Sequence, residues 1–367
     1  MQNPLHIPIL QNLQIASSAL NLQPELWEGR SLGAICFSTG IQISRTQPGN
    51  TQPDSFSANA AMPCMHIPAP VLGSEEAACE IWLSNIDALA GRRGAINYRY
   101  DDATLFGVIE LREADFVYAG HATSLQQATE SAYQQIFALL HELNFSYPYR
   151  FWNYMADING ISHELERYQQ FNIGRQNAFI AHGRQITGQL PAACALGVAE
   201  GSLQIAFIAG RSPSLAIENP RQISAYEYPE QYGPSSPTFA RASLLNFNQC
   251  KLLLISGTAS IVGHQTLHVG DVIAQTHETL NNLKAIVSEA NRLLNQDKFD
   301  LATSFYRVYL RHAADLPLVR NEMQRVFGNH VQALFLQAEI CRQNLLLEIE
   351  ASIFSAPGST RQKRSQL

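Results

Sequence analysis

The chain has 367 residues, of which 46% are hydrophobic and 15% charged, and its net charge is −6. This length allows two domains. A negative net charge without a basic run in the body of the chain argues against nucleic acid or an anionic membrane as partner. The sequence shows neither a signal-peptide pattern nor a run of eighteen apolar residues, so we expect a cytoplasmic protein without a membrane span.

The cysteines are far apart along the chain. They show no CxxC spacing and no sequence cluster with histidine, so neither a structural zinc site nor a disulfide framework is expected. The six positions are Cys36, Cys64, Cys79, Cys194, Cys250 and Cys341.

The first half of the chain contains a strand, a helix, a second strand and a second helix. Residues 103–113 (ATLFGVIELRE) form a predicted strand, and residues 118–144 show apolar residues at helical spacing. The following segment, YRFWNYMADINGISHELERYQQF, indicates an aromatic strand, a turn and a helix.

The same order of signals returns in the second half. A strand is predicted over 251–263, a helix over 268–294 with a stripe that includes Leu280, Leu283 and Ile286, and then an aromatic strand and helix in SFYRVYLRHAADLPLVRNEMQRVF. The chain therefore reads as two copies of one α+β unit, with mixed sheets and helices packed on one face.

The predicted domains are 1–185 and 186–355, followed by a disordered tail over 356–367. Residues 219–243 break both periodicities and form an ordered loop or a linker. The segment GQLPAACALGVAEGSLQIAFIAGRS, which follows the boundary, is expected to form a strand pair that opens the second unit.

The last predicted strand, within residues 341–352, carries two carboxylates on one face. Its alternation places Leu347 and Ile349 on one side and Glu348 and Glu350 on the other. If the second face meets solvent, the glutamates are surface charges. If it lines a cavity, a poorly solvated carboxyl group there is able to act as an acid near neutral pH.

The second unit resembles the RidA-like (YjgF) family, whose fold is chorismate-mutase-like. The matching segments are LLLISGTASI, HVGDVIAQTHETLNNLKAIV, FYRVYLRHAADL and LLLEIEAS. Two such units with YRFWNYMADIN, ERYQQFNIGR, NPRQISAYEYP and YGPSSPTFARAS resemble the chorismatases, over about residues 100 to 355.

This resemblance implies a reaction that uses no cofactor and no metal, with the small molecule chorismate as substrate. Protonation of its enolpyruvyl ether needs a proton donor in a dry site and cations for two carboxylates. The family's donor is a glutamate on the last strand, and its position matches Glu348. Glu350 is then expected to form a structural pair.

Arginine is the side chain best suited to holding carboxylates. The expected substrate-binding residues are Arg150, Tyr168, Arg175, Arg241 and Arg311. Arg175 and Arg241 lie in family-like motifs. Each arginine taken singly also fits a surface or ion-pair role. Arg307, Tyr309 and Arg311 share one face of their strand, which therefore is not plain core. The histidines show no spacing that indicates a metal site or a catalytic triad.

Two positions are expected to govern which product forms. In chorismatases that aromatise the ring to 3-hydroxybenzoate, a cysteine precedes the catalytic glutamate by seven residues, as Cys341 precedes Glu348. A glycine within SGTAS favours aromatisation and an alanine favours a non-aromatic diene. The best match, Ala259, favours the diene. Mixed signals fit the group that also yields 4-hydroxybenzoate. Cys341 can equally be a small buried filler.

The sequence leaves two other functions open. RidA-like deaminases hold the substrate carboxylate with an arginine on the strand before the last, where this chain has Phe335 in VQALFLQAE. The fold alone also allows a ligand-binding protein without catalysis. We expect a monomer, or a homo-oligomer formed through sheet edges.

Overall fold

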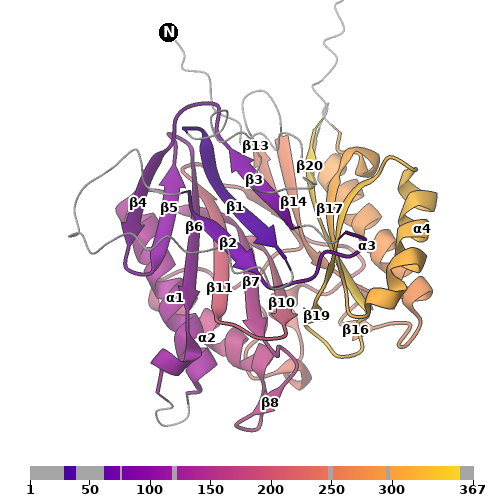
Figure 1. Cartoon of the computed structure of the whole chain (residues 1–367), viewed down its shortest axis with the longest axis horizontal. Helices are drawn as coiled ribbons and strands as arrows, with labels where there is room; N and C mark the ends of the chain where they lie inside the picture. The colour runs from indigo at the N-terminus through magenta and orange to yellow at the C-terminus, as the bar shows by residue number, and fades with distance from the viewer. Residues whose placement is uncertain are drawn as a thin grey trace, which may run out of the picture.

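A computed structural model describes residues 29–38, 62–74, 77–117, 122–246, 251–294 and 298–355. The described strands form three main sheets around a central core, and the α-helices lie outside them (Figure 1). None of the described helices is long and apolar enough to span a membrane. The predicted tail over 356–367 lies outside the described residues.

The first main sheet has seven strands in the order β19-β10-β7-β11-β6-β5-β4. Their bounds are Leu89–Arg93 (β4), Ile96–Tyr100 (β5), Thr104–Leu111 (β6), Tyr147–Ala156 (β7), Ala192–Val198 (β10), Leu203–Gly210 (β11) and Glu339–Ile340 (β19). Helices α1 (Ser124–Glu142) and α2 (Arg167–Ala181) pack on its outer face.

The second main sheet has six strands in the order β12-β13-β14-β20-β17-β18. Their bounds are Leu215–Ile217 (β12), Ala242–Asn246 (β13), Lys251–Thr258 (β14), Phe305–Leu310 (β17), Gln332–Gln337 (β18) and Leu347–Phe354 (β20). Helices α3 (Val272–Arg292) and α4 (Leu316–Phe327) cover it. The predicted stripe on α3, including Leu280, Leu283 and Ile286, is buried.

These two sheets repeat one topology. The order β5-β6-β11-β7-β10 in the first matches β13-β14-β20-β17-β18 in the second, and the helices follow equivalent strands. β7 and β10 run parallel, as do β17 and β18. The predicted α+β class with two units is therefore confirmed.

One expectation about the middle of the chain is wrong. β10 and β11 do not pair with each other to open the second unit, because each of them pairs with β7 from opposite sides. They occupy the places that β18 and β20 hold in the second sheet. The sheet of the first unit thus extends to Gly210, past the boundary predicted between residues 185 and 186.

A third sheet of three strands lies over the other two and closes the core (Figure 1). It consists of β1 (Ser31–Phe37), flanked by β2 (Cys64–Ile67) and β3 (Ala78–Leu83). Its inward side chains, among them Phe37, Ile67 and Trp82, pack with residues of both other sheets. Short hairpins complete the described strands: β8 (Ile161–Ser162) with β9 (Leu165–Glu166), and β15 (Ile261–Val262) with β16 (Gln265–Thr266).

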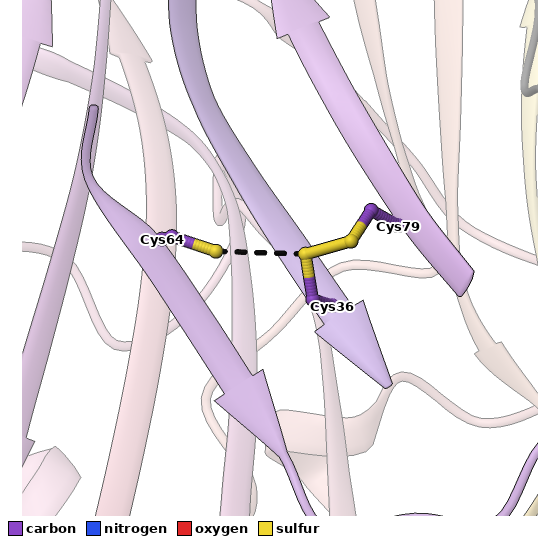
Figure 2. The surroundings of a disulfide bond; sticks show 3 residues. All are labelled: Cys36, Cys64 and Cys79. Carbon is purple, nitrogen blue, oxygen red and sulfur yellow. Dashed lines mark hydrogen bonds between the residues drawn. A yellow bond between two sulfur atoms is a disulfide. The ribbon is translucent and has the colours of Figure 1, made fainter. Parts of the chain in front are cut away.

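The third sheet also corrects the expectation about cysteines. Cys36 on β1 and Cys79 on β3 form a disulfide, and the Cys64 Sγ on β2 lies 3.5 Å from the Cys36 Sγ (Figure 2). The pairing register sets Cys36 opposite Cys79. Strand pairing brings together residues that lie 43 positions apart in sequence, and local spacing motifs carry no signal of this kind.

Candidate active site

A cavity of about 120 Å³ opens between the two repeated units. Its walls come from α2, from β10 of the first sheet, from β14 and β20 of the second, and from the loop between β12 and β13. Most of the predicted site residues lie on it. They are Tyr168, Arg175, Arg241, Ala259, Cys341 and Glu348.

Helix α2 contributes two of these side chains from one face. Tyr168 and Arg175 are seven residues apart, which is two turns of a helix. The buried Arg175 donates from Nη2 to Asn172 Oδ1 at 3.3 Å, and its guanidinium lies over the Phe171 ring. Burial raises the pKa of Tyr168, so its hydroxyl stays protonated.

The Pro- and Tyr-rich segment is an ordered loop that covers the cavity. Its 3-10 helices, η3 (Ala225–Glu227) and η4 (Glu230–Tyr232), bring in Tyr228 and Tyr232, which the sequence reasoning did not select. Arg241 donates from Nη2 to the Tyr228 hydroxyl at 2.9 Å and to the Ile223 carbonyl at 2.8 Å. The sequence signal that could have indicated these two residues is their spacing, because Tyr228 and Tyr232 lie four residues apart in one loop.

Arg342 is a cavity residue that the sequence reasoning also missed. Its guanidinium lies over the Tyr232 ring at 4.1 Å, and its Nη1 donates to the His264 carbonyl at 2.8 Å. It follows Cys341 directly in the chain. The sequence signal for Arg342 is thus its place next to Cys341, which precedes Glu348 by seven residues.

Glu348 is 4% exposed and faces the cavity from β20. Its Oε1 has no hydrogen-bond partner among the described residues. Burial raises the pKa of Glu348 to about 8, and the nearby charge of Glu350 raises it as well, while Arg150 acts in the opposite direction. The carboxyl group is therefore largely protonated at neutral pH.

A glycine makes room for this carboxyl group. A Cβ atom added at Gly257, on the neighbouring strand β14, would overlap with Glu348 Oε1. The overlap is with the far end of the Glu348 side chain, so a side chain at position 257 would force this carboxyl group to shift. Gly257 thus helps to define where the carboxyl group of Glu348 lies.

Glu350 lies two residues further along the same face and has a different environment. It pairs with Arg150 and, at 2.9 Å, with Arg307, and it accepts a hydrogen bond from Tyr309 at 2.8 Å. Burial alone would raise the pKa of Glu350, but the two arginines and this hydrogen bond outweigh burial and lower it. Glu350 is an ionised member of a buried ion-pair network.

Two of the predicted substrate-binding residues do not reach the cavity. Arg150 is held in the ion pair with Glu350 and also donates to the Ile255 carbonyl. Arg311 pairs with Glu339 and donates to the carbonyl groups of Leu345, at 2.8 Å, and Arg342, at 2.9 Å. The structure therefore assigns both arginines to internal contacts.

Three arginines line the cavity, and two of them have a carboxylate nearby: Glu166, itself a lining residue, is near Arg342, and Glu218 is near Arg241. Within the described residues, no ion pair joins Arg175, Arg241 or Arg342 to a carboxylate. Each also has a buried N–H group without a hydrogen-bond partner in the described structure: Nε of Arg175, Nε of Arg241 and Nη2 of Arg342. Since buried N–H groups are nearly always paired, this lining is suited to a ligand with more than one anionic group.

Several known proteins of one family are similar to this chain. Residues 80–209 match a family model described as "Chorismatase FkbO/Hyg5-like, N-terminal". A protein named 3-hydroxybenzoate synthase from Streptomyces hygroscopicus is 33% identical over 292 residues, which cover 77% of this chain and 83% of that protein. The chain belongs to the chorismatase family.

Two further relatives support this membership. A protein named chorismatase from Streptomyces hygroscopicus is 32% identical over 284 residues, covering 76% of this chain and 80% of that protein. A crystal structure of a chorismatase is 28% identical and superposes with a TM-score of 0.80, covering 96% of this chain and all of that one. The chorismatase similarity thus covers both units.

This member of the chorismatase family has Phe335 at the position where RidA-like deaminases are expected to have a substrate-binding arginine. Phe335 on β18 is buried in the apolar core of the second unit, where the Arg320 guanidinium covers its ring. Phe335 is not among the residues that line the cavity. The chorismatase cavity instead has its cations on α2, on the covering loop and beside Cys341.

Proposed function

We propose that this enzyme cleaves the enolpyruvyl ether of chorismate to pyruvate and 3-hydroxybenzoate, with Glu348 as the general acid. The observation that carries the proposal is one buried carboxyl group, its pKa raised to about 8, in a cavity with three arginines that each have a buried N–H group without a hydrogen-bond partner among the described residues. Chorismate has two carboxylates and an acid-sensitive ether, and this lining complements both.

The first step is transfer of the Glu348 proton to the methylene carbon of the ether. The resulting oxocarbenium ion is attacked by the ring hydroxyl or by water, and pyruvate leaves. Burial supports the step because it keeps the acid protonated at neutral pH and excludes bulk water. The carboxylate left on Glu348 is then placed to take back a proton.

The three cavity arginines would bind the two carboxylates of the substrate. Each has one buried N–H group without a hydrogen-bond partner in the described structure, which a ligand would satisfy. The phenylalanine and tyrosine rings next to Arg175, Arg241 and Arg342 hold the guanidinium planes in place. Arg150 and Arg311 are proposed to support the site from outside the cavity instead of binding substrate.

The product depends on the second half of the reaction. Cys341 lines the cavity, and burial, followed by the charge of Glu348, raises the pKa of its thiol to about 12. Cys341 therefore stays a neutral thiol. Ala259 also lines the cavity, but Gly257 is the residue of the SGTAS segment that would collide with Glu348 if it carried a Cβ. Because a glycine stands at this more sensitive position, we favour aromatisation.

The test is to incubate the purified enzyme with chorismate, without metal or nucleotide, and to separate the products by chromatography. Pyruvate with 3-hydroxybenzoate, alone or with 4-hydroxybenzoate, is the expected result. Pyruvate with a dihydroxycyclohexadiene carboxylate would keep Glu348 as the acid and give Ala259 the deciding role. Absence of pyruvate would overturn the proposal.

A further inference from the structure

The outward face of the three-stranded sheet gathers three cysteines and one histidine. Cys36 of the central strand β1 lies opposite Cys79 on β3 and opposite His66 on β2. Cys64 precedes His66 by two residues and therefore points to the same side of the sheet. The alternate residues, among them Ile35, Phe37, Met65 and Ile67, pack into the core.

The sulfur and nitrogen atoms of this group lie close enough to share one ion. Cys64 Sγ is 3.5 Å from Cys36 Sγ (Figure 2). The potential ligand atoms of Cys36, Cys64 and His66 all lie within 4.8 Å of one another. Cys79 Sγ is bonded directly to Cys36 Sγ. Zinc–sulfur bonds of about 2.3 Å in a tetrahedron place two sulfur atoms about 3.8 Å apart, close to the spacing seen here.

We propose that the reduced chain binds one zinc ion through Cys36, Cys64, Cys79 and His66, and that the disulfide is the oxidised, metal-free form of the same site. Three thiolates and one imidazole form a closed tetrahedral set that is typical of structural zinc. The strands hold all four residues on one face without help from a local sequence motif.

The redox step balances with a dithiol as reductant. The dithiol gives two electrons and two protons to the Cys36–Cys79 disulfide and becomes a disulfide itself. Zinc then replaces the thiol protons of Cys36, Cys64 and Cys79 and takes the neutral nitrogen of His66, so binding releases protons. Oxidation removes two thiolates and with them the affinity for the ion.

A zinc ion bound by these four residues would cross-link β2 and β3 to the central strand β1. Next to Cys79, Glu80 points inward and pairs with Arg307 at 2.6 Å, and Arg307 pairs with Glu350. A cross-link at Cys79, by disulfide or by zinc, therefore fixes the strand that carries one end of the buried ion-pair network.

The experiment uses the full chain in two forms, reduced with a phosphine and oxidised with a disulfide reagent. Each form is incubated with zinc, passed through a desalting column and analysed for metal content and free thiols. We expect about one zinc per reduced chain and almost none per oxidised chain. Cobalt in place of zinc should give the strong near-ultraviolet absorption of a thiolate–cobalt bond in the reduced form alone.

Variants separate this site from chance binding. Cys64→Ser and His66→Ala leave the Cys36–Cys79 disulfide possible and should weaken zinc binding at least tenfold in competition with a chromophoric chelator. Cys194→Ser removes a buried cysteine elsewhere and should bind zinc like the unaltered chain. Equal zinc binding by the reduced and oxidised chains, or by Cys64→Ser and the unaltered chain, would overturn the proposal. The comparison of the two redox forms needs no variant, so a folding defect does not obscure it.

Discussion

Glu348 and Glu350 are two residues apart on one face of β20, and the pKa values of their carboxyl groups shift in opposite directions. Glu350 has Arg150 and Arg307 as ion-pair partners, whereas Glu348 Oε1 has no hydrogen-bond partner in the described structure. The role of Glu348 also depends on Glu350, because the charge of Glu350 helps to keep the proton on Glu348.

The acid role of Glu348 is tested by Glu348→Gln, which keeps the size of the side chain and removes the transferable proton. We expect pyruvate release to fall by roughly 10²–10⁴-fold, the contribution usual for general acid catalysis. Substrate affinity should change little, because the arginines remain. Steady-state kinetics with chorismate measures both. A variant that retains more than a tenth of the activity would exclude Glu348 as the proton donor.

The raised pKa of Glu348 sets the pH dependence of both rate and stability. The acid form is needed, so kcat/KM should be level below about pH 8 and fall about tenfold per pH unit above it. The unfolded chain loses this proton near the ordinary value of 4.5, so Glu348 makes stability fall between pH 4.5 and about 8. Chemical denaturation across this range should show a shallower fall in Glu348→Gln. A rate that rises through pH 8 would contradict this assignment.

The ion-pair network is tested by Glu350→Gln. Removing this carboxylate leaves Arg150 without its buried ion-pair partner and Arg307 with Glu80, and breaking such a pair costs about 3–5 kcal/mol. The midpoint of chemical denaturation should fall accordingly. The upper limb of the pH–rate profile should also move to lower pH, because the charge that raises the pKa of Glu348 is gone. An unmoved profile would show that the two carboxyl groups do not interact.

Gly257 is tested by Gly257→Ala. The new Cβ would displace the Glu348 carboxyl group, and a shift of about 1 Å in a reacting group can cost about 10²-fold in rate. We expect a lower kcat and a larger share of the non-aromatic diene. Ala259→Gly is the matched control, since it changes a position two residues further along by one methyl group in the opposite direction. If Ala259→Gly shifts the products and Gly257→Ala does not, position 259 governs the outcome.

The binding arginines are tested by Arg342→Gln and by Arg311→Gln as its control. Arg342 has a buried N–H group that is free for a ligand, and a hydrogen bond to a charged group contributes about 1.5–3 kcal/mol. KM should therefore rise about tenfold or more in Arg342→Gln. Arg311 is fully engaged with Glu339 and backbone carbonyl groups, so Arg311→Gln should lower the melting temperature and leave KM nearly unchanged. The reverse pattern would return Arg311 to the substrate.

The sequence by itself determined the repeated α+β units, because strand and helix periodicity depend on local residue order. It also placed Glu348 and Glu350 on one face, and the resemblance pointed to Tyr168, Arg175, Arg241, Ala259 and Cys341, all of which line the cavity. Only the shared face of the two glutamates follows from alternation along one strand, and the other positions depend on the resemblance.

Only the tertiary structure decided which side chains form ion pairs and which strands pair with each other. Periodicity does not tell which carboxylate receives an arginine, so the separation of Glu348 from Glu350 depends on how β7 approaches β20 from another sheet. For the same reason the sequence does not reveal that Arg150 and Arg311, both expected to bind substrate, have internal ion-pair partners. Strand pairing between distant segments placed β10 and β11 in the first sheet and brought Cys36 to Cys79. These contacts form between surfaces that exist only after the elements have packed.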